Sequence, residues 1–240
     1  MLRHSSGKYF PHLIIILLSV LFYGTSLQND FALDDRFIFE NIPPKDAPAS
    51  DIFKVFSQRF VREDYRPVAY FTYAVEQMVV GEIKPIVSHS INLFLYIAVI
   101  ILLYSTISLL PVANSTSIAL AAAVLFLAHP AHAGVVNNLK SRDGLFSMLF
   151  LLGALKAFLI YEQHKKWYLI LAGAMLFLLG VFSKLDALNL IFILPILLLL
   201  LYKKDWKWTL LSGYLIFMCY IIFRVVLLDK IVPPEKLALT

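Results

Sequence analysis

Long apolar runs dominate the hydrophobic pattern of this chain, and polar residues gather in the segments between them. A transmembrane helix needs about 20 apolar residues, whereas a half-buried strand would alternate apolar and polar positions. The pattern therefore predicts an all-α fold, a polytopic membrane helix bundle with about seven transmembrane helices. The predicted spans are residues 9–27, 89–110, 116–133, 145–161, 167–182, 187–202 and 208–228.

A long outer loop, residues 28–88, separates the first two predicted spans. Within it, residues 66–80 are largely apolar, but they are too few to cross a bilayer and Glu76 interrupts them. Pro67 suits the first turn of a helix, so we expect an interfacial helix here. We treat residues 1–240 as a single membrane domain, with interfacial helices in 28–88 and a helix bundle in 89–228.

Composition supports a membrane protein. The chain is 60% hydrophobic and 15% charged, with a mean hydropathy of +0.78, whereas soluble domains carry about 25% charged residues. The net charge of +5 is explained by basic residues at the ends of apolar runs, so we expect a membrane and no nucleic acid as partner. The single cysteine, Cys219, excludes an internal disulfide.

Basic residues in the short connections predict the orientation. In the seven-span topology they fall on one side, which the positive-inside rule makes cytoplasmic. These residues are Arg3, Lys8, Lys165, Lys166, Lys203, Lys204 and Lys207. The chain is thus expected to be a multi-pass protein of a bacterial inner membrane or the ER membrane, with a cytoplasmic N-terminus. The first run resembles a signal peptide, but six more spans and the lack of a clear cleavage site favour an uncleaved helix.

The opposite face collects the ionisable residues of three outer segments. These are Asp34 and Asp35 after the first span, then His129, His132, Lys140, Arg142 and Asp143, and finally Lys184 and Asp186. Ionisable groups at membrane depth are costly and tend to be functional. Simpler explanations stay open: solvated aspartates, histidines that cap a helix end, cations that reach lipid headgroups, and carboxylates that pair with those cations.

Five short motifs follow one another in a recognisable order. They are Asp34-Asp35 before Arg36 and Asn41; Tyr65-Arg66-Pro67; Gly81, Pro85, His89 and Asn92; His129-Pro130 with His132, Val136 and Arg142; and Ser183-Lys184. In this order the chain resembles the C-type (GT-C) membrane glycosyltransferases, specifically the protein O-mannosyltransferase-like group, whose members often carry tetratricopeptide repeats. The resemblance covers residues 30 to about 200 and corresponds to the N-terminal module of such enzymes.

Three positions depart from the family pattern. Gly134 stands where a glutamate is usual, Asp143 directly follows Arg142 instead of lying two residues on, and Leu185 replaces a glutamate before Asp186. Family members usually continue with further spans and a repeat domain. A minimal form, a fragment and a degenerate copy therefore all stay open.

The resemblance implies a glycosyltransferase that moves a mannose-like sugar from a polyprenyl- or dolichyl-phosphate carrier. The implied acceptor is a hydroxyl on the outer face, on a protein serine or threonine or on a glycan. Asp34 or Asp35 would be the catalytic base, and the donor phosphate would bind Arg66, His129, His132, Arg142 and Lys184. Supporting roles fall to Arg36, His89, Asn92, Asp143 and Asp186. We expect no cofactor and no bound metal, although the acidic pair and the histidines leave a divalent ion open.

A non-catalytic membrane protein is the alternative: a transporter, a lipid-binding scaffold or an inactive glycosyltransferase fragment. Transporters place charges near the bilayer midplane. Here Lys156 and Arg224 are the strong charges within predicted spans, and both lie near span ends. Clustering at one interface favours interfacial chemistry.

Overall fold

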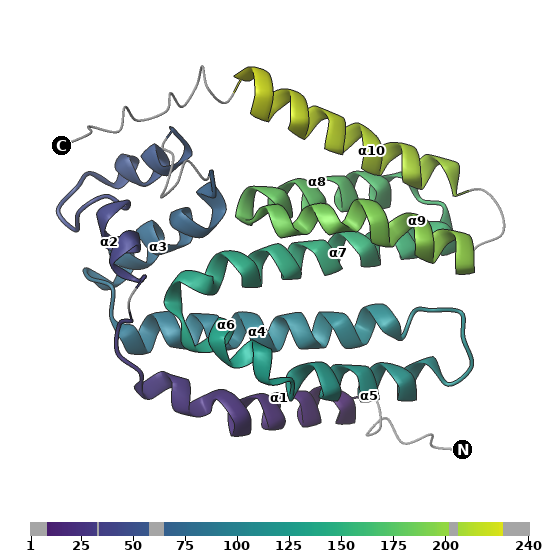
Figure 1. Cartoon of the computed structure of the whole chain (residues 1–240), viewed down its shortest axis with the longest axis horizontal. Coiled ribbons are helices and arrows are strands. Elements are labelled where there is room, and N and C mark those ends of the chain that lie inside the picture. Colours follow the sequence, from purple (N-terminus) through teal and green to yellow (C-terminus); the bar gives the residue numbers. More distant parts are fainter. Residues whose placement is uncertain (1–8, 33, 58–64, 202–205, 228–240) are drawn as a thin grey trace.

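The computed structural model describes residues 9–32, 34–57, 65–201 and 206–227. All regular elements in this described part are helical, which confirms the all-α prediction. The long helices lie side by side and alternate in direction, while α2 and α3 gather at one end of the bundle (Figure 1).

The bundle helices are α1 (Phe10–Tyr23), α4 (Pro85–Ile107), α5 (Ser115–Leu127), α7 (Arg142–His164), α8 (Trp167–Ser183), α9 (Leu190–Leu201) and α10 (Lys207–Ile222). The outer loop holds α2 (Arg36–Glu40), η3 (Ala49–Ser57) and α3 (Pro67–Val80). Short connecting elements are η2 (Gly24–Gln28), η5 (Pro130–His132), α6 (Ala133–Asn137), η6 (Leu139–Ser141), η7 (Leu185–Asn189) and the π-helical turn η8 (Phe223–Leu227).

Judged by helix length and composition, the described residues contain fewer candidate membrane spans than the sequence predicts. Among the described residues, four helical stretches are long and apolar enough to cross: Phe10–Gln28, Pro85–Ile107, Leu139–His164 and Lys207–Val226. A fifth is α5 together with residues 130–137, which meet at a bend of 56°. The apolar stretches Trp167–Ser183 and Leu185–Leu201 fall short of the same length. About seven spans are therefore not confirmed.

The predicted span 116–133 is interrupted for a local reason. His129 precedes Pro130 and adopts an extended conformation, with φ −71° and ψ 126°. A residue before proline is pushed away from the helical region because the proline ring clashes with its backbone. Helix α5 therefore ends at Leu127, and the chain turns into the short elements η5 and α6.

Helix α3 forms where an interfacial helix was expected. It begins at Pro67 and ends before Gly81, whose φ of +83° places it in the left-handed conformation typical of helix ends. With 14 residues it is about 21 Å long, less than the roughly 30 Å of a bilayer core. Most of its contacts are with η3, α7 and α8.

Apolar side chains form two clusters in the bundle and a smaller one under the outer loop. The first is centred on Phe158 and Phe177 between α7 and α8, and the second joins α1, α4 and α5. The third unites Ile38, Val55 and Tyr73 with Leu139 of η6. Leu139 thus ties the outer loop to the bundle; that the whole chain is one domain stays a prediction.

The three polar segments meet at one end of the bundle. Helices α1, α5 and α8 end there, α4, α7 and α9 begin there, and the outer loop lies over the same end (Figure 1). Lys165, Lys166 and Lys207 belong to the opposite end. Arg3, Lys8, Lys203 and Lys204 lie outside the described residues, and the membrane side of each end stays a prediction.

Candidate functional site

Asp35 is a buried anchor between two polar segments. The whole residue is 1% exposed. One carboxylate oxygen accepts the Ala32 amide at 2.8 Å, and the other accepts the Lys140 amide at 3.2 Å. Because both oxygens are used by backbone donors, Asp35 fixes the outer loop against η6.

Asp34 differs from its neighbour, since 52% of its side chain is exposed. Its carboxylate lies 3.1 Å from Nζ of Lys140, which also lies 5.2 Å from the Phe37 ring centre. Arg36 is exposed and lies 5.0 Å from the same ring. Of the two aspartates, Asp34 is therefore the one that an outside molecule can reach.

Arg66 and Asp143 join the outer loop to α7 through an ion pair. Arg66 is the residue that precedes α3, and Asp143 lies in the first turn of α7, where a carboxylate is favoured by the helix dipole. Asp143 therefore pairs with Arg66 of the outer loop and not with the adjacent Arg142, as the simpler explanation had it.

Lys184 brings the third polar segment to the same place. Its ammonium lies 3.0 Å from the Asp186 carboxylate, and about a third of its side chain is exposed. The same ammonium is 3.9 Å from the position that a Cβ would occupy on Gly144. The Ser147 hydroxyl donates to the Lys184 carbonyl at 3.1 Å. The start of α7 therefore contacts both Arg66 and Lys184.

Arg142 is enclosed within the protein rather than displayed at this surface. It is 0% exposed, and its Nε donates to Asn92 Oδ1 at 3.0 Å. One terminal nitrogen donates to the Ser88 carbonyl at 3.3 Å, and the other lies 2.8 Å from a Glu76 oxygen. The guanidinium also stacks 4.1 Å from the Tyr73 ring centre. This arrangement favours a structural role over the predicted contact with a donor phosphate, which stays untested.

His89 is fully buried at the start of α4. The backbones of Asp30 and Val136 lie near its ring, but neither ring nitrogen makes a well-formed hydrogen bond within the described part of the chain. His89 thus lies inside the protein, close to Asp35, and its supporting role stays a prediction.

The two predicted phosphate-binding histidines are used locally. His129 Nδ1 accepts the Ala131 amide at 3.2 Å and so caps η5. His132 Nδ1 lies 2.6 Å from the Phe126 carbonyl, and its ring stacks on Phe126 at 4.1 Å. Among the described residues, no three or more histidine, cysteine, aspartate or glutamate side chains lie close enough together to hold a metal ion. The helix-capping interpretation therefore fits His129, while phosphate binding stays a prediction.

Sequence reasoning missed three residues of this region. Glu76 and Tyr73 of α3 and Ser88 of α4 surround Arg142, and the Ser88 hydroxyl donates to Glu76. Glu76 carried a signal, because a lone carboxylate in an apolar helix requires a buried partner. Tyr73 and Ser88 are ordinary residue types with no comparable signal.

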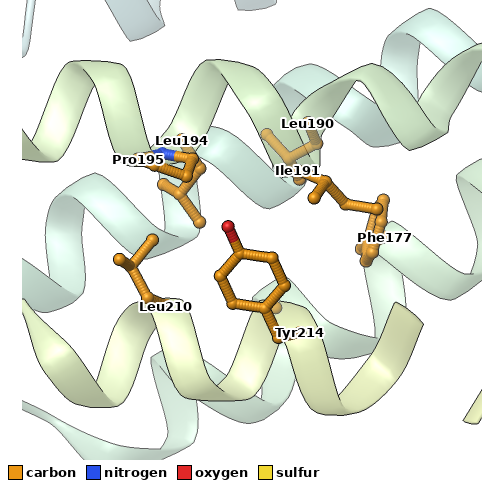
Figure 2. A pocket seen from close by; sticks show the side chains of 8 residues that line it. Phe177, Leu190, Ile191, Leu194, Pro195, Leu210 and Tyr214 are labelled. Carbon is orange, nitrogen blue, oxygen red and sulfur yellow. The ribbon is translucent and has the colours of Figure 1, made fainter. Parts of the chain in front are cut away.

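An apolar pocket lies apart from this polar region, between α8, α9 and α10. Figure 2 shows Phe177 of α8 facing Leu190 and Leu194 of α9, with Tyr214 of α10 between them. Among the residues that line it, Tyr214 alone carries a polar side-chain group. The described residues that line this pocket include no carboxylate, imidazole or cation.

Comparison with known proteins decides the family resemblance. The chain is 30% identical to "Protein O-mannosyl-transferase TMTC1" of Homo sapiens over an alignment of 155 residues that covers 60% of this chain and 17% of that protein. It is 28% identical to "Protein O-mannosyl-transferase F38B6.6" of Caenorhabditis elegans over 153 residues, 60% of this chain and 22% of that protein. It is 25% identical to "Protein O-mannosyl-transferase TMTC4" of Homo sapiens over 173 residues, 62% of this chain and 23% of that protein. The chain is a homologue of TMTC-type protein O-mannosyl-transferases.

The similarity has a limited extent. The chain spans less than a quarter of the length of each of these TMTC-type relatives. No family model matches the sequence, and no solved structure matches it. The resemblance inferred from the motifs is confirmed. Because the chain matches only part of each relative, that it has the relatives' activity is a proposal.

Proposed function

We propose that this chain carries the reaction site of a membrane mannosyltransferase at the end of its helix bundle where the polar segments meet. It would transfer mannose from a polyprenyl- or dolichyl-phosphate carrier to a serine or threonine hydroxyl of a protein on the outer face of the membrane. The homology to protein O-mannosyl-transferases supports the reaction class. The single observation that carries the proposal for this chain is an exposed carboxylate, Asp34, paired with Lys140 at the end of the bundle where Arg66 and Lys184 also lie.

The cations suit a lipid-borne phosphate. Lys140 and Lys184 hold carboxylates that are themselves largely exposed, Asp34 at 52% and Asp186 at 66%. A phosphate can replace such a carboxylate at an ammonium group with little cost in burial, and charge-assisted hydrogen bonds to phosphate are strong. The carrier's hydrocarbon tail would lie among the apolar helices, with its phosphate at this end.

Asp34 is the better candidate for the catalytic base, because Asp35 is buried and holds two backbone amides. In the proposed step the acceptor hydroxyl oxygen attacks the anomeric carbon of the donor sugar. Its proton passes to Asp34 as the bond between that carbon and the phosphate oxygen breaks. The products are an O-mannosylated protein with inverted anomeric configuration and the free polyprenyl phosphate. Lys140, Lys184 and Arg66 would stabilise the charge that gathers on the leaving phosphate.

The test is mannose transfer in membranes containing the chain, with radiolabelled polyprenyl-phosphate mannose and a serine- and threonine-rich peptide. We expect Asp34→Asn to lower the rate by about 10²–10⁴-fold, the usual contribution of a general base. Thermal stability should change little, since Asp34 is exposed. Asp35→Asn should lower both transfer and stability, because Lys140 and Ala32 amides lose a charged acceptor.

Glu40→Gln is the matched control, since Glu40 is exposed on the neighbouring helix α2 and should leave the rate unchanged. Equal transfer by the parent and by Asp34→Asn would remove Asp34 from the mechanism. Binding of the labelled carrier without any transfer would instead support a lipid-binding scaffold or inactive module.

A further inference from the structure

The outer loop is attached to α7 by two ion pairs of opposite polarity. Arg66, next to α3, pairs with Asp143, whereas Glu76 within α3 pairs with Arg142. The partners on α7 are consecutive residues, so the two attachments act at a single point of the bundle.

The pair of Glu76 and Arg142, here called the inner pair, is less exposed to solvent than the pair of Arg66 and Asp143. The side chains of Arg142 and Glu76 are 0% and 2% exposed, against 24% and 9% for Arg66 and Asp143. The Ser88 hydroxyl occupies the second carboxylate oxygen of Glu76. Loss of either inner charge therefore leaves the other one buried without its counter-ion, which is far more costly than losing a surface pair.

A chain of contacts connects the inner pair to the acidic pair, Asp34 and Asp35. Asn92 accepts from Arg142 through its amide oxygen and donates through its amide nitrogen to the Leu139 carbonyl at 3.3 Å. The next residue, Lys140, donates its backbone amide to Asp35 and its ammonium to Asp34.

We propose that Glu76 and Arg142 are positioning residues, which hold α3 and η6 so that Arg66, Lys140 and Asp34 all lie at this end of the bundle. This assignment rests on the proposed function for its consequence in catalysis, while the docking of α3 is measurable without it. Glu76 lies outside all five motifs that carry the family resemblance.

Docking can be followed by cross-linking in the full chain. The rings of Tyr65, just before α3, and Phe182, near the end of α8, are 6.0 Å apart. We would place cysteines at both positions in a Cys219→Ser background and react them with a short bifunctional thiol reagent. Glu76→Gln should slow cross-linking by about tenfold, because an unpaired buried guanidinium favours displacement of α3. Glu82→Gln, in the exposed pair with Lys84, is the matched control and should cross-link like the parent.

A second variant separates position from mere stability. Glu76→Gln/Arg142→Gln removes both charges, so no unpaired ion is left and thermal stability should recover toward that of the parent. Cross-linking and transfer should stay low if the ion pair sets position. Recovery of cross-linking together with stability would overturn the proposal, as would normal cross-linking in Glu76→Gln. If the parent transfers no mannose, the proposed function fails, and the cross-linking rates still decide whether Glu76 and Arg142 position α3.

Discussion

At the scale of single residues, one backbone carbonyl of the site accepts hydrogen bonds from two different helices. The carbonyl of Leu139 accepts the Tyr73 hydroxyl from α3 and the Asn92 amide from α4. Burial raises the pKa of the Tyr73 phenol, so this hydroxyl stays protonated and donates at physiological pH. Two donors on one acceptor make the contact tolerant of losing one, but Asn92 also serves Arg142.

We therefore expect unequal effects from two substitutions. Tyr73→Phe removes a neutral hydrogen bond whose acceptor keeps another donor, so it should cost about 0.5–1.5 kcal/mol of stability. Asn92→Ala leaves a buried charged donor unsatisfied and should cost more, about 2–3 kcal/mol. Thermal unfolding of the purified chain in detergent measures both. Equal losses would mean that Arg142 finds another acceptor when Asn92 is removed.

The sequence predicted which residue types meet, but not which of them are covered. Asp34 and Asp35 are indistinguishable as letters, and only the fold shows that one is exposed and the other buried. Arg142 and Lys184 look alike as candidate phosphate ligands, although Arg142 is enclosed by residues from two other helices. Burial depends on contacts between distant segments, which a local motif does not encode.

At the scale of helices, α7 and α8 make the most intimate contact of the bundle. A Cβ on Gly173 of α8 would lie 2.7 and 2.9 Å from ring carbons of Phe158 in α7. Such distances are well below van der Waals contact, so glycine is needed for this close approach. Phe158 is itself 0% exposed and has little room to move.

Gly173→Ala should accordingly destabilise the chain by about 1–3 kcal/mol, the usual cost of overpacking a core. Gly134→Ala is a fitting comparison, because a Cβ on Gly134 meets nothing within 4 Å. Alanine also favours helix relative to glycine, so this variant should be neutral or slightly stabilising. Thermal melting of the two variants side by side gives the answer; a Gly173→Ala melt identical to the parent would show that Phe158 relocates freely.

Helix positions were the most predictable feature of the fold. Apolar runs located α1, α4, α7, α8, α9 and α10 to within a few residues, because burying such a run in lipid requires a helix. The break of the third predicted span at His129-Pro130 was missed, since hydropathy alone does not register a backbone conformation.

At the scale of the whole molecule, the two ends of the bundle differ in chemistry. One end holds the acidic pair and its cations, and the other holds Lys165 and the buried Glu162, which pair with each other. The Thr209 hydroxyl of α10 also donates to Glu162, so that end is fastened by a contact between α7 and α10. The two ends are expected to face opposite sides of the membrane.

Cysteine labelling tests this sidedness directly. In a Cys219→Ser background, Ala131→Cys marks the acidic end and Gln163→Cys marks the opposite end; both positions are exposed. A membrane-impermeant maleimide added outside intact cells or sealed vesicles of known orientation should label Ala131→Cys alone. Gln163→Cys should react only after permeabilisation. Labelling of both cysteines in intact vesicles would contradict the predicted topology.

The enclosure of Arg142 has a consequence for the order of events during synthesis. Tyr73, Glu76, Ser88 and Asn92 all precede Arg142 in the chain. A polypeptide emerges from the ribosome N-terminus first, so every group that receives this guanidinium is available before it is made. The nascent protein therefore never has to carry the arginine into hydrocarbon while its acceptors are still untranslated.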